Sequence, residues 1–235
     1  MNDTAGREGL MAFCHTVFGW EFEVGGPETA YYSIAQINGV PVAGIGQMEG
    51  SVAQWTTYLA TKDLDATVVK AKELGANVFF EPIDVMEQGR LALMMDPTNA
   101  VVGLWEQKNF AGSGVYGEPN APFWHNHSST DPKRAAEFYR DLFGVTVIEN
   151  DGMYSLSEGA DEPAYASVSP NPNPDDMPAH WAPILLTESL AVTRERVTGA
   201  GGTLMFESMA VPGGDITAFQ DPVVGSFMTV FAPTP

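Results

Sequence analysis

An internal repeat constrains the fold of this chain more than any other feature of its sequence. Residues 9–22 (GLMAFCHTVFGWEF) align with residues 135–147, so that Phe13 falls on Phe138, an offset of 125 residues. Further matched pairs follow along both halves of the chain: Tyr32 with Tyr154, Pro41 with Pro163, Gly75 with Gly201, Glu81 with Glu207 and Asp96 with Asp221. A repeat of this kind predicts that one supersecondary module is used more than once.

The clearest copy of the repeated motif is residues 123–145 (FWHNHSSTDPKRAAEFYRDLFGV). Its first residues alternate and carry aromatic side chains, which predicts a half-buried strand over 123–128. Asp131 and Pro132 then provide an N-cap and a first-turn proline, and Gly144 provides a helix stop. Apolar residues recur between them at helical spacing, at Ala135, Phe138, Tyr139, Leu142 and Phe143. We therefore expect a strand followed by an amphipathic helix.

The remaining elements repeat the same order in both halves. Asn38-Gly39, within residues 31–48, predicts a hairpin turn between two strands. The first half continues with strands expected at 55–60, 77–81, 89–95 and 101–106 and a helix at 62–74. The second half continues with strands expected at 153–170, 181–187, 203–207, 215–219 and 227–231 and a helix at 190–198. Each half is predicted to hold two strand-helix-strand-strand-strand modules.

The predicted fold class is α+β, with domains at 1–108 and 123–235 joined by a Gly- and Pro-rich linker at 109–122. The first domain has no residues to form the strand before its first helix, because residues 1–8 are too few and too polar. Either the true start lies upstream or another segment takes that place. A missing strand leaves an unpaired sheet edge, so we expect the linker or a second chain, as in a homodimer, to cover it.

Charge and composition exclude several classes of function. Eleven basic and thirty acidic residues give a net charge of −19, which should repel nucleic acid and anionic membranes. No apolar run approaches the roughly 20 residues that span a bilayer, and no signal-like segment opens the chain. The single cysteine, Cys14, fits a reducing compartment, and its apolar setting predicts a buried thiol. These features predict a cytoplasmic protein.

Residues 130–144 (TDPKRAAEFYRDLFG), together with the closing segment 96–106 (DPTNAVVGLWE), resemble the vicinal oxygen chelate superfamily. That superfamily includes glyoxalase I, bleomycin-resistance proteins, fosfomycin-resistance enzymes and extradiol dioxygenases, and the similarity is greatest to its tandem glyoxalase-like members. The resemblance implies that each domain folds two βαβββ modules into a cupped mixed sheet around a cavity. It also implies that metal-using members take ligands from the first, fifth and last strands of a domain, so that the metal holds two adjacent substrate oxygens.

In the second domain the resemblance places these ligand positions at Trp124, His180 and Met228. Only His180 can bind a metal, although His125 lies one residue from the first position. His125 and His127 share a strand face, so they could also chelate as a pair.

In the first domain the corresponding later positions are Gln54 and Gly103, and Glu106 lies three residues beyond the second of these. Non-haem iron usually requires two nitrogens and a carboxylate. The sequence therefore argues against a standard metalloenzyme.

Aromatic residues on or beside the predicted strands suggest a ligand cup instead. Inward-facing rings in a cupped sheet would suit a planar or hydrophobic small molecule, or would simply fill the space. The candidate ligand-binding residues are Trp124, Asn126, Trp181, Tyr154, Trp55, Tyr32 and Trp105.

Two functions remain open from the sequence. The first is a protein like the bleomycin-resistance branch, which binds a small molecule in an aromatic cup without a complete metal site. The second is a superfamily lyase, isomerase or dioxygenase acting on a small oxygenated substrate. In that case His180 is the catalytic group or a ligand, with His125, of a divalent metal such as iron, zinc, nickel or manganese.

Overall fold

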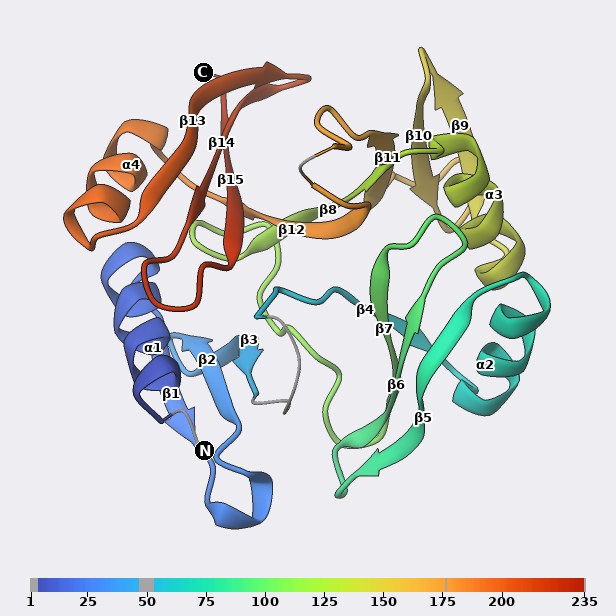
Figure 1. Ribbon diagram of the computed structural model, residues 1–235, viewed down its shortest axis with the longest axis horizontal. Helices are drawn as coiled ribbons and strands as arrows, with labels where there is room; N and C mark the ends of the chain where they lie inside the picture. The colour runs from blue at the N-terminus through green and yellow to red at the C-terminus, as the bar shows by residue number, and fades with distance from the viewer. Residues whose placement is uncertain (1–3, 47–52, 176, 235) are drawn as a thin grey trace. The chain divides into compact units, whose positions relative to one another are not determined.

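The computed structural model describes residues 4–46, 53–175 and 177–234 (Figure 1). The chain is an α+β protein whose elements follow the order predicted from the repeat. We number its four modules 1 to 4 along the chain, and modules 2 to 4 have the βαβββ order.

Module 1 begins directly with a helix. Its elements are α1 (Thr4–Phe18), β1 (Glu21–Val24), β2 (Ser33–Ile37) and β3 (Val40–Ile45). Gly19 has a left-handed φ of 73° and ends α1, as Gly144 does in the aligned helix, and Phe22 lies in the strand that follows. Asn38 and Gly39 have φ values of 51° and 77°, which confirms the predicted hairpin turn. No strand precedes α1 within the described residues.

Module 2 contains all five elements. They are β4 (Tyr58–Thr61), α2 (Leu64–Glu73), β5 (Asn77–Val85), β6 (Gly89–Met95) and β7 (Val101–Gln107). Trp55 falls before β4 and not within it. Strand β5 is longer than predicted and shifts its register against β6 on both sides of Phe80.

Modules 3 and 4 repeat the same plan. Module 3 consists of β8 (Pro122–Ser129), α3 (Pro132–Phe143), β9 (Thr146–Asn150), β10 (Met153–Ser157) and β11 (Ala166–Pro170). Module 4 consists of β12 (His180–Leu186), α4 (Leu190–Gly199), β13 (Thr203–Val211), β14 (Gly214–Gln220) and β15 (Phe227–Pro233). The predicted cap is present, because Asp131 Oδ1 accepts a 3.1 Å hydrogen bond from Arg134 N, and Gly144 ends α3 with a φ of 74°.

Strand pairing shows why these are modules. In modules 2, 3 and 4 the first strand runs parallel to the last, as β4 with β7, β8 with β11 and β12 with β15. The other strands of each module pair antiparallel, giving the orders β4-β7-β6-β5, β8-β11-β10-β9 and β12-β15-β14-β13. Module 1 forms β1-β2-β3 alone.

The chain forms two compact units that do not follow the two halves of the repeat. Unit 1 contains the described parts of residues 1–55, 112–123 and 184–235, and unit 2 contains residues 56–111 and the described parts of 124–183. Helices α1 and α4 pack together in unit 1, and α2 and α3 pack together in unit 2. The predicted bounds 1–108, 109–122 and 123–235 thus describe the sequence repeat, whereas the units pair module 1 with 4 and module 2 with 3.

Part of the linker lies against β3, the strand that has no parallel neighbour in module 1. Gly114 N donates a 2.8 Å hydrogen bond to Pro41 O, and Val115 is buried in the same core as Val42. At this point the linker covers the sheet edge, as one of the two predicted alternatives required.

None of the described helices is long and apolar enough to cross a membrane.

Candidate functional site: a polar chain on β8 and β11

The two faces of the β8–β11 pair in unit 2 have different characters. The parallel register places Asn126 opposite Ser167 and His127 opposite Val168. His127 and Val168 are fully buried, whereas Trp124 and Asn126 remain partly exposed. Because strand side chains alternate, one face packs into the core with α3 and the other carries Trp124 and Asn126.

Four side chains on the second face form a continuous series of hydrogen bonds. Trp124 Nε1 donates to Ser167 Oγ at 2.8 Å, and Ser167 Oγ donates to Asn126 Oδ1 at 2.7 Å. Asn126 Nδ2 then donates to Ser169 Oγ at 3.0 Å. We call these four residues the polar chain. Trp124 and Asn126 were predicted from the sequence as ligand-binding residues, whereas the two serines were not; the alternation of serine in ASVSP (166–170) was the available signal.

The opposite face takes part in a buried network. His127 Nε2 lies 2.7 Å from Asp96 Oδ2, and neither side chain is exposed. The Tyr139 hydroxyl donates to the same oxygen at 2.8 Å, and Trp181 Nε1 donates to the Tyr139 oxygen at 2.8 Å. The network therefore joins β8, α3 and β12 to the turn that follows β6.

Electrostatics fix the protonation states in this network. Burial by itself raises the pKa of Asp96. The hydrogen bond and charge of His127, together with the hydrogen bonds from the Tyr139 hydroxyl and Ala100 N–H, outweigh burial, so the pKa of Asp96 is lowered overall. Burial, reinforced by the Asp96 charge, raises the pKa of Tyr139 well above its usual value. Asp96 is thus ionised and Tyr139 neutral near pH 7. Since these groups are sealed from solvent, the network holds elements together and does not face a ligand.

Two predicted site residues lie on this core side. Trp181 is only 3% exposed, so its position favours core packing over ligand contact. His125 shares the His127 face of β8, and its Nδ1 lies 3.4 Å from Thr57 Oγ1. Burial lowers the pKa of His125. The structure therefore does not bring His125 onto the face that carries Trp124.

His180 begins β12 and is partly exposed. Its Nδ1 lies 2.8 Å from Pro178 O, and because a carbonyl can only accept, Nδ1 must carry the hydrogen. The lone pair of the neutral ring is then on Nε2. Burial lowers the pKa of His180, and the weaker effect of the Pro178 carbonyl opposes this. By alternation, His180 points away from the core that contains Trp181.

The other predicted aromatic residues are divided between the units. In unit 2, Tyr154 is half-buried on β10, and Trp105 Nε1 donates to Phe110 O at 2.9 Å. In unit 1, Trp55 makes an edge contact with Trp20 at 6.0 Å between ring centroids. The Tyr32 ring, also in unit 1, covers Gly44. These residues do not all belong to one compact unit.

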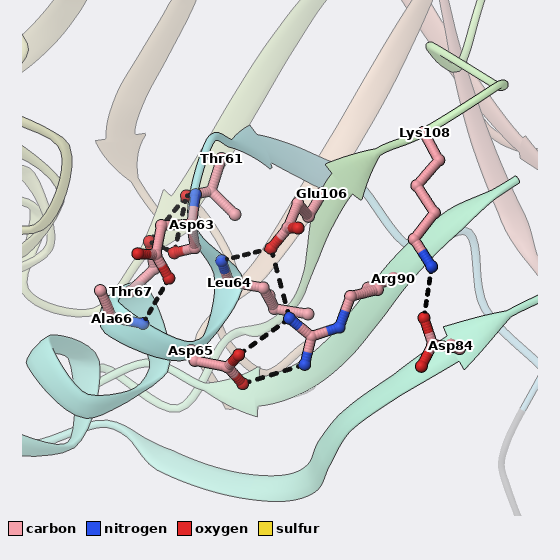
Figure 2. A network of polar contacts seen from close by, with 10 residues as sticks. All are labelled: Thr61, Asp63, Leu64, Asp65, Ala66, Thr67, Asp84, Arg90, Glu106 and Lys108. Atoms are coloured by element: carbon pink, nitrogen blue, oxygen red, sulfur yellow. Dashed lines mark hydrogen bonds and ion pairs between the residues drawn. The ribbon is translucent and has the colours of Figure 1, made fainter.

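Glu106, the carboxylate closest to the last-strand ligand position of the first half, has another role. Figure 2 shows its Oε2 accepting a 2.7 Å hydrogen bond from Leu64 N, at the start of α2. Arg90 Nη1 lies 3.5 Å from the same oxygen. The Arg90 guanidinium also forms a bidentate ion pair with Asp65, with hydrogen bonds of 2.8 and 3.0 Å. A carboxylate at a helix N-terminus satisfies an unpaired N–H and complements the helix dipole.

The residues present do not fit the metal site that the superfamily resemblance implies. Trp124 occupies the first-strand position, and an indole N–H is only a donor. At the last-strand position of module 2, a Cβ on Gly103 would collide with the ring of Tyr58. In the described part of the chain, no three His, Cys, Asp or Glu side chains are grouped so that they could hold a metal ion.

Comparison with solved structures shows the fold. The Mn(II)-bound glyoxalase from Novosphingobium aromaticivorans matches with a TM-score of 0.64 and 17% identity, covering 96% of this chain and 77% of its own. The 2,3-dioxygenase LapB from Pseudomonas sp. KL28 matches with a TM-score of 0.64 and 12% identity, covering 97% and 88%. No protein-family model matches the chain.

Sequence relatives agree with the fold. Together with the repeated modules they support the resemblance to the vicinal oxygen chelate superfamily. The chain is 29% identical over 246 residues to the putative glyoxylase CFP32 of Mycobacterium tuberculosis (strain CDC 1551 / Oshkosh), covering 99% of this chain and 92% of the relative. It is 27% identical over 188 residues to the anthracycline biosynthesis protein DauV of Streptomyces sp. (strain C5), covering 77% and 66%.

Proposed function

We propose that this protein binds a small planar organic molecule without a metal ion, on the face of unit 2 that carries the polar chain. The observation that carries the proposal is the Trp124–Ser167 hydrogen bond, 2.8 Å long. It holds an indole where metal-using members of the superfamily have a ligand. At the last-strand ligand position of module 2, an aromatic ring again lies where a metal ligand would be, because the Tyr58 ring covers Gly103.

The chemistry of this face suits such a ligand. A tryptophan offers a broad apolar surface with one polar atom, and here that atom is already satisfied by Ser167. An aromatic ligand on this face would then leave the Trp124–Ser167 hydrogen bond intact. The name of DauV refers to anthracycline biosynthesis, and anthracyclines are planar, oxygenated polycycles, which supports the same class of ligand.

A second candidate function is catalysis at His180, with or without a divalent metal. It is favoured by the geometry of this side chain, whose Nδ1 is fixed by Pro178 and whose ring is kept neutral by burial. A neutral imidazole with its lone pair on Nε2 is the form that acts as a general base or binds a metal. The substrate would be a small oxygenated molecule.

Equilibrium dialysis of chelator-treated protein against fluorene, a planar tricycle, tests the first proposal. We expect saturable binding at one site per chain, unchanged when Mn(II), Fe(II), Ni(II) or Zn(II) is added. Trp124→Ala should weaken binding at least tenfold. Trp105→Ala, which removes a ring bonded to Phe110 and outside the polar chain, serves as the matched control.

Binding that appears only after metal is added would instead favour the second candidate. In that case, His180→Ala should abolish both metal uptake and turnover while the circular dichroism spectrum stays unchanged. Absence of fluorene binding under all conditions would overturn the first proposal.

A further inference from the structure

We infer that the ligand presents a hydrogen-bond acceptor to the polar chain, and that its class is a planar aromatic ketone or quinone. This inference rests on the proposed function and specifies the chemistry of the same face. Its basis is the direction in which hydrogens are donated along the four residues.

Trp124 fixes the first bond of that series. Because the indole N–H can only donate, Ser167 Oγ must accept from it, and the single hydroxyl hydrogen of Ser167 goes to Asn126 Oδ1. With Oδ1 accepting, Asn126 Nδ2 donates to Ser169 Oγ. In this arrangement every hydrogen bond runs from Trp124 towards Ser169, and the hydrogen of Ser167 finds an acceptor.

The series ends on unused donors. Ser169 Oγ accepts from Asn126 and keeps its own hydrogen, for which the described residues offer no acceptor. Asn126 Nδ2 likewise has a second hydrogen for which the described residues show no acceptor. Asn126 and Ser169 are both partly exposed, so water can satisfy these donors while the face is open.

A ligand that covers this face removes that water. Buried donors without an acceptor are rarer and costlier than acceptors with an unused lone pair. A ligand carbonyl oxygen would satisfy the Ser169 hydroxyl or the Asn126 amide, whereas a ligand N–H or O–H would meet another donor. The indole of Trp124 beside them supplies the apolar surface for the ring. The face therefore favours a ligand that carries a hydrogen-bond acceptor beside its aromatic ring.

Three tricyclic probes of one shape test the selection. Fluorenone, fluorene and carbazole carry C=O, CH₂ and N–H at the same ring position. In equilibrium dialysis we expect fluorenone to bind about 3- to 10-fold more tightly than fluorene, the range that one neutral hydrogen bond supplies. Carbazole should bind no more tightly than fluorene.

Two variants locate the effect. Ser169→Ala removes the terminal hydroxyl, and Asn126→Asp gives Ser169 an acceptor that consumes its hydrogen. Both should bring the fluorenone-to-fluorene ratio towards 1. Ser155→Ala is the matched control, because Ser155 pairs with Ser167 from β10 but lies outside the polar chain.

The outcomes separate this inference from the proposed function. Equal binding of the three probes, tighter binding of carbazole, or an unchanged ratio in both folded variants would overturn the inference and leave the proposed function standing. Failure of all three probes to bind would overturn both. The expected ratio in the wild type, lost in either folded variant and kept in Ser155→Ala, supports both.

Discussion

Asp96 Oδ2 and His127 Nε2 lie 2.7 Å apart, and neither side chain is exposed, although the two residues are 31 positions apart in the sequence. Asp96 follows β6, and His127 is in the middle of β8. Their contact ties module 2 to module 3 within unit 2, and Tyr139 and Trp181 extend it to α3 and β12.

Asp96→Asn should destabilise the protein strongly. Asparagine offers one oxygen where Asp96 offers two, so a buried partner of Asp96 is left without its acceptor, at a cost of roughly 1 to 3 kcal/mol in the free energy of unfolding. Urea unfolding followed by circular dichroism measures the change. Asp65→Asn, which breaks an exposed pair with Arg90, should unfold close to the wild-type midpoint. Similar midpoints for the two variants would contradict the assigned role of Asp96.

The stability contributed by Asp96 should disappear in acid. Its pKa in the folded state is lowered, so its contribution is fully present above the unfolded-state pKa of about 4 and is lost as pH falls through the lower folded value. Urea midpoints between pH 6 and pH 2.5 should therefore fall more steeply in the wild type than in Asp96→Asn. Parallel curves would show that other carboxylates dominate acid unfolding.

Gly103→Ala should destabilise unit 2, because the new Cβ meets the Tyr58 ring. Overpacking of this kind costs roughly 1 to 3 kcal/mol. Adding Tyr58→Ala should recover part of that loss, so the two changes should be non-additive in a double-mutant cycle. Additive effects would mean that the ring does not limit the space at Gly103.

Glu106→Ala should cost about 1 kcal/mol, typical of a lost helix N-terminal acceptor. Glu106→Gln keeps an acceptor for Leu64 N but loses the charge near Arg90, so its unfolding free energy should lie between those of the alanine variant and the wild type. Metal content measured by mass spectrometry should be the same in all three proteins. A metal lost on substitution would assign Glu106 to a metal centre instead.

Cys14 should resist thiol reagents while the protein is folded. The side chain is completely buried, and burial with the charge of Asp221 raises the pKa of its thiol to about 12. Only the thiolate reacts, so Ellman's reagent at pH 8 should label native protein at the slow rate of unfolding and urea-denatured protein within seconds. Rapid stoichiometric labelling of native protein would show that α1 opens readily.

The modules could be predicted from the sequence because their signals are local. The Asn38-Gly39 turn, the Asp131 cap and the Gly144 stop each depend on a few adjacent residues, and all three are present. Strands β1 and β9 were missed because they are short and largely exposed, so their residues show little apolar alternation.

The site was predictable only in part. Alternation correctly separated Trp124 from His127, because it depends on one strand. The partners Ser167 and Ser169 come from a second strand, 41 to 43 residues away in sequence, and are brought opposite by the parallel register. Trp181 fits an aromatic cup equally well from sequence alone. Its 3% exposure and its hydrogen bond to Tyr139 show that it belongs to the core.

The pairing of modules also sets the order in which the chain can fold as it leaves the ribosome. Unit 2 is complete once residue 183 has been made, whereas unit 1 needs residues 184–235 as well as the described part of 1–55. Module 1 is therefore synthesised well before its partner module 4, and the apolar side of α1 lacks α4 until residues 184–235 emerge. During that interval the growing chain exposes an unpartnered amphipathic helix, the type of surface that chaperones protect.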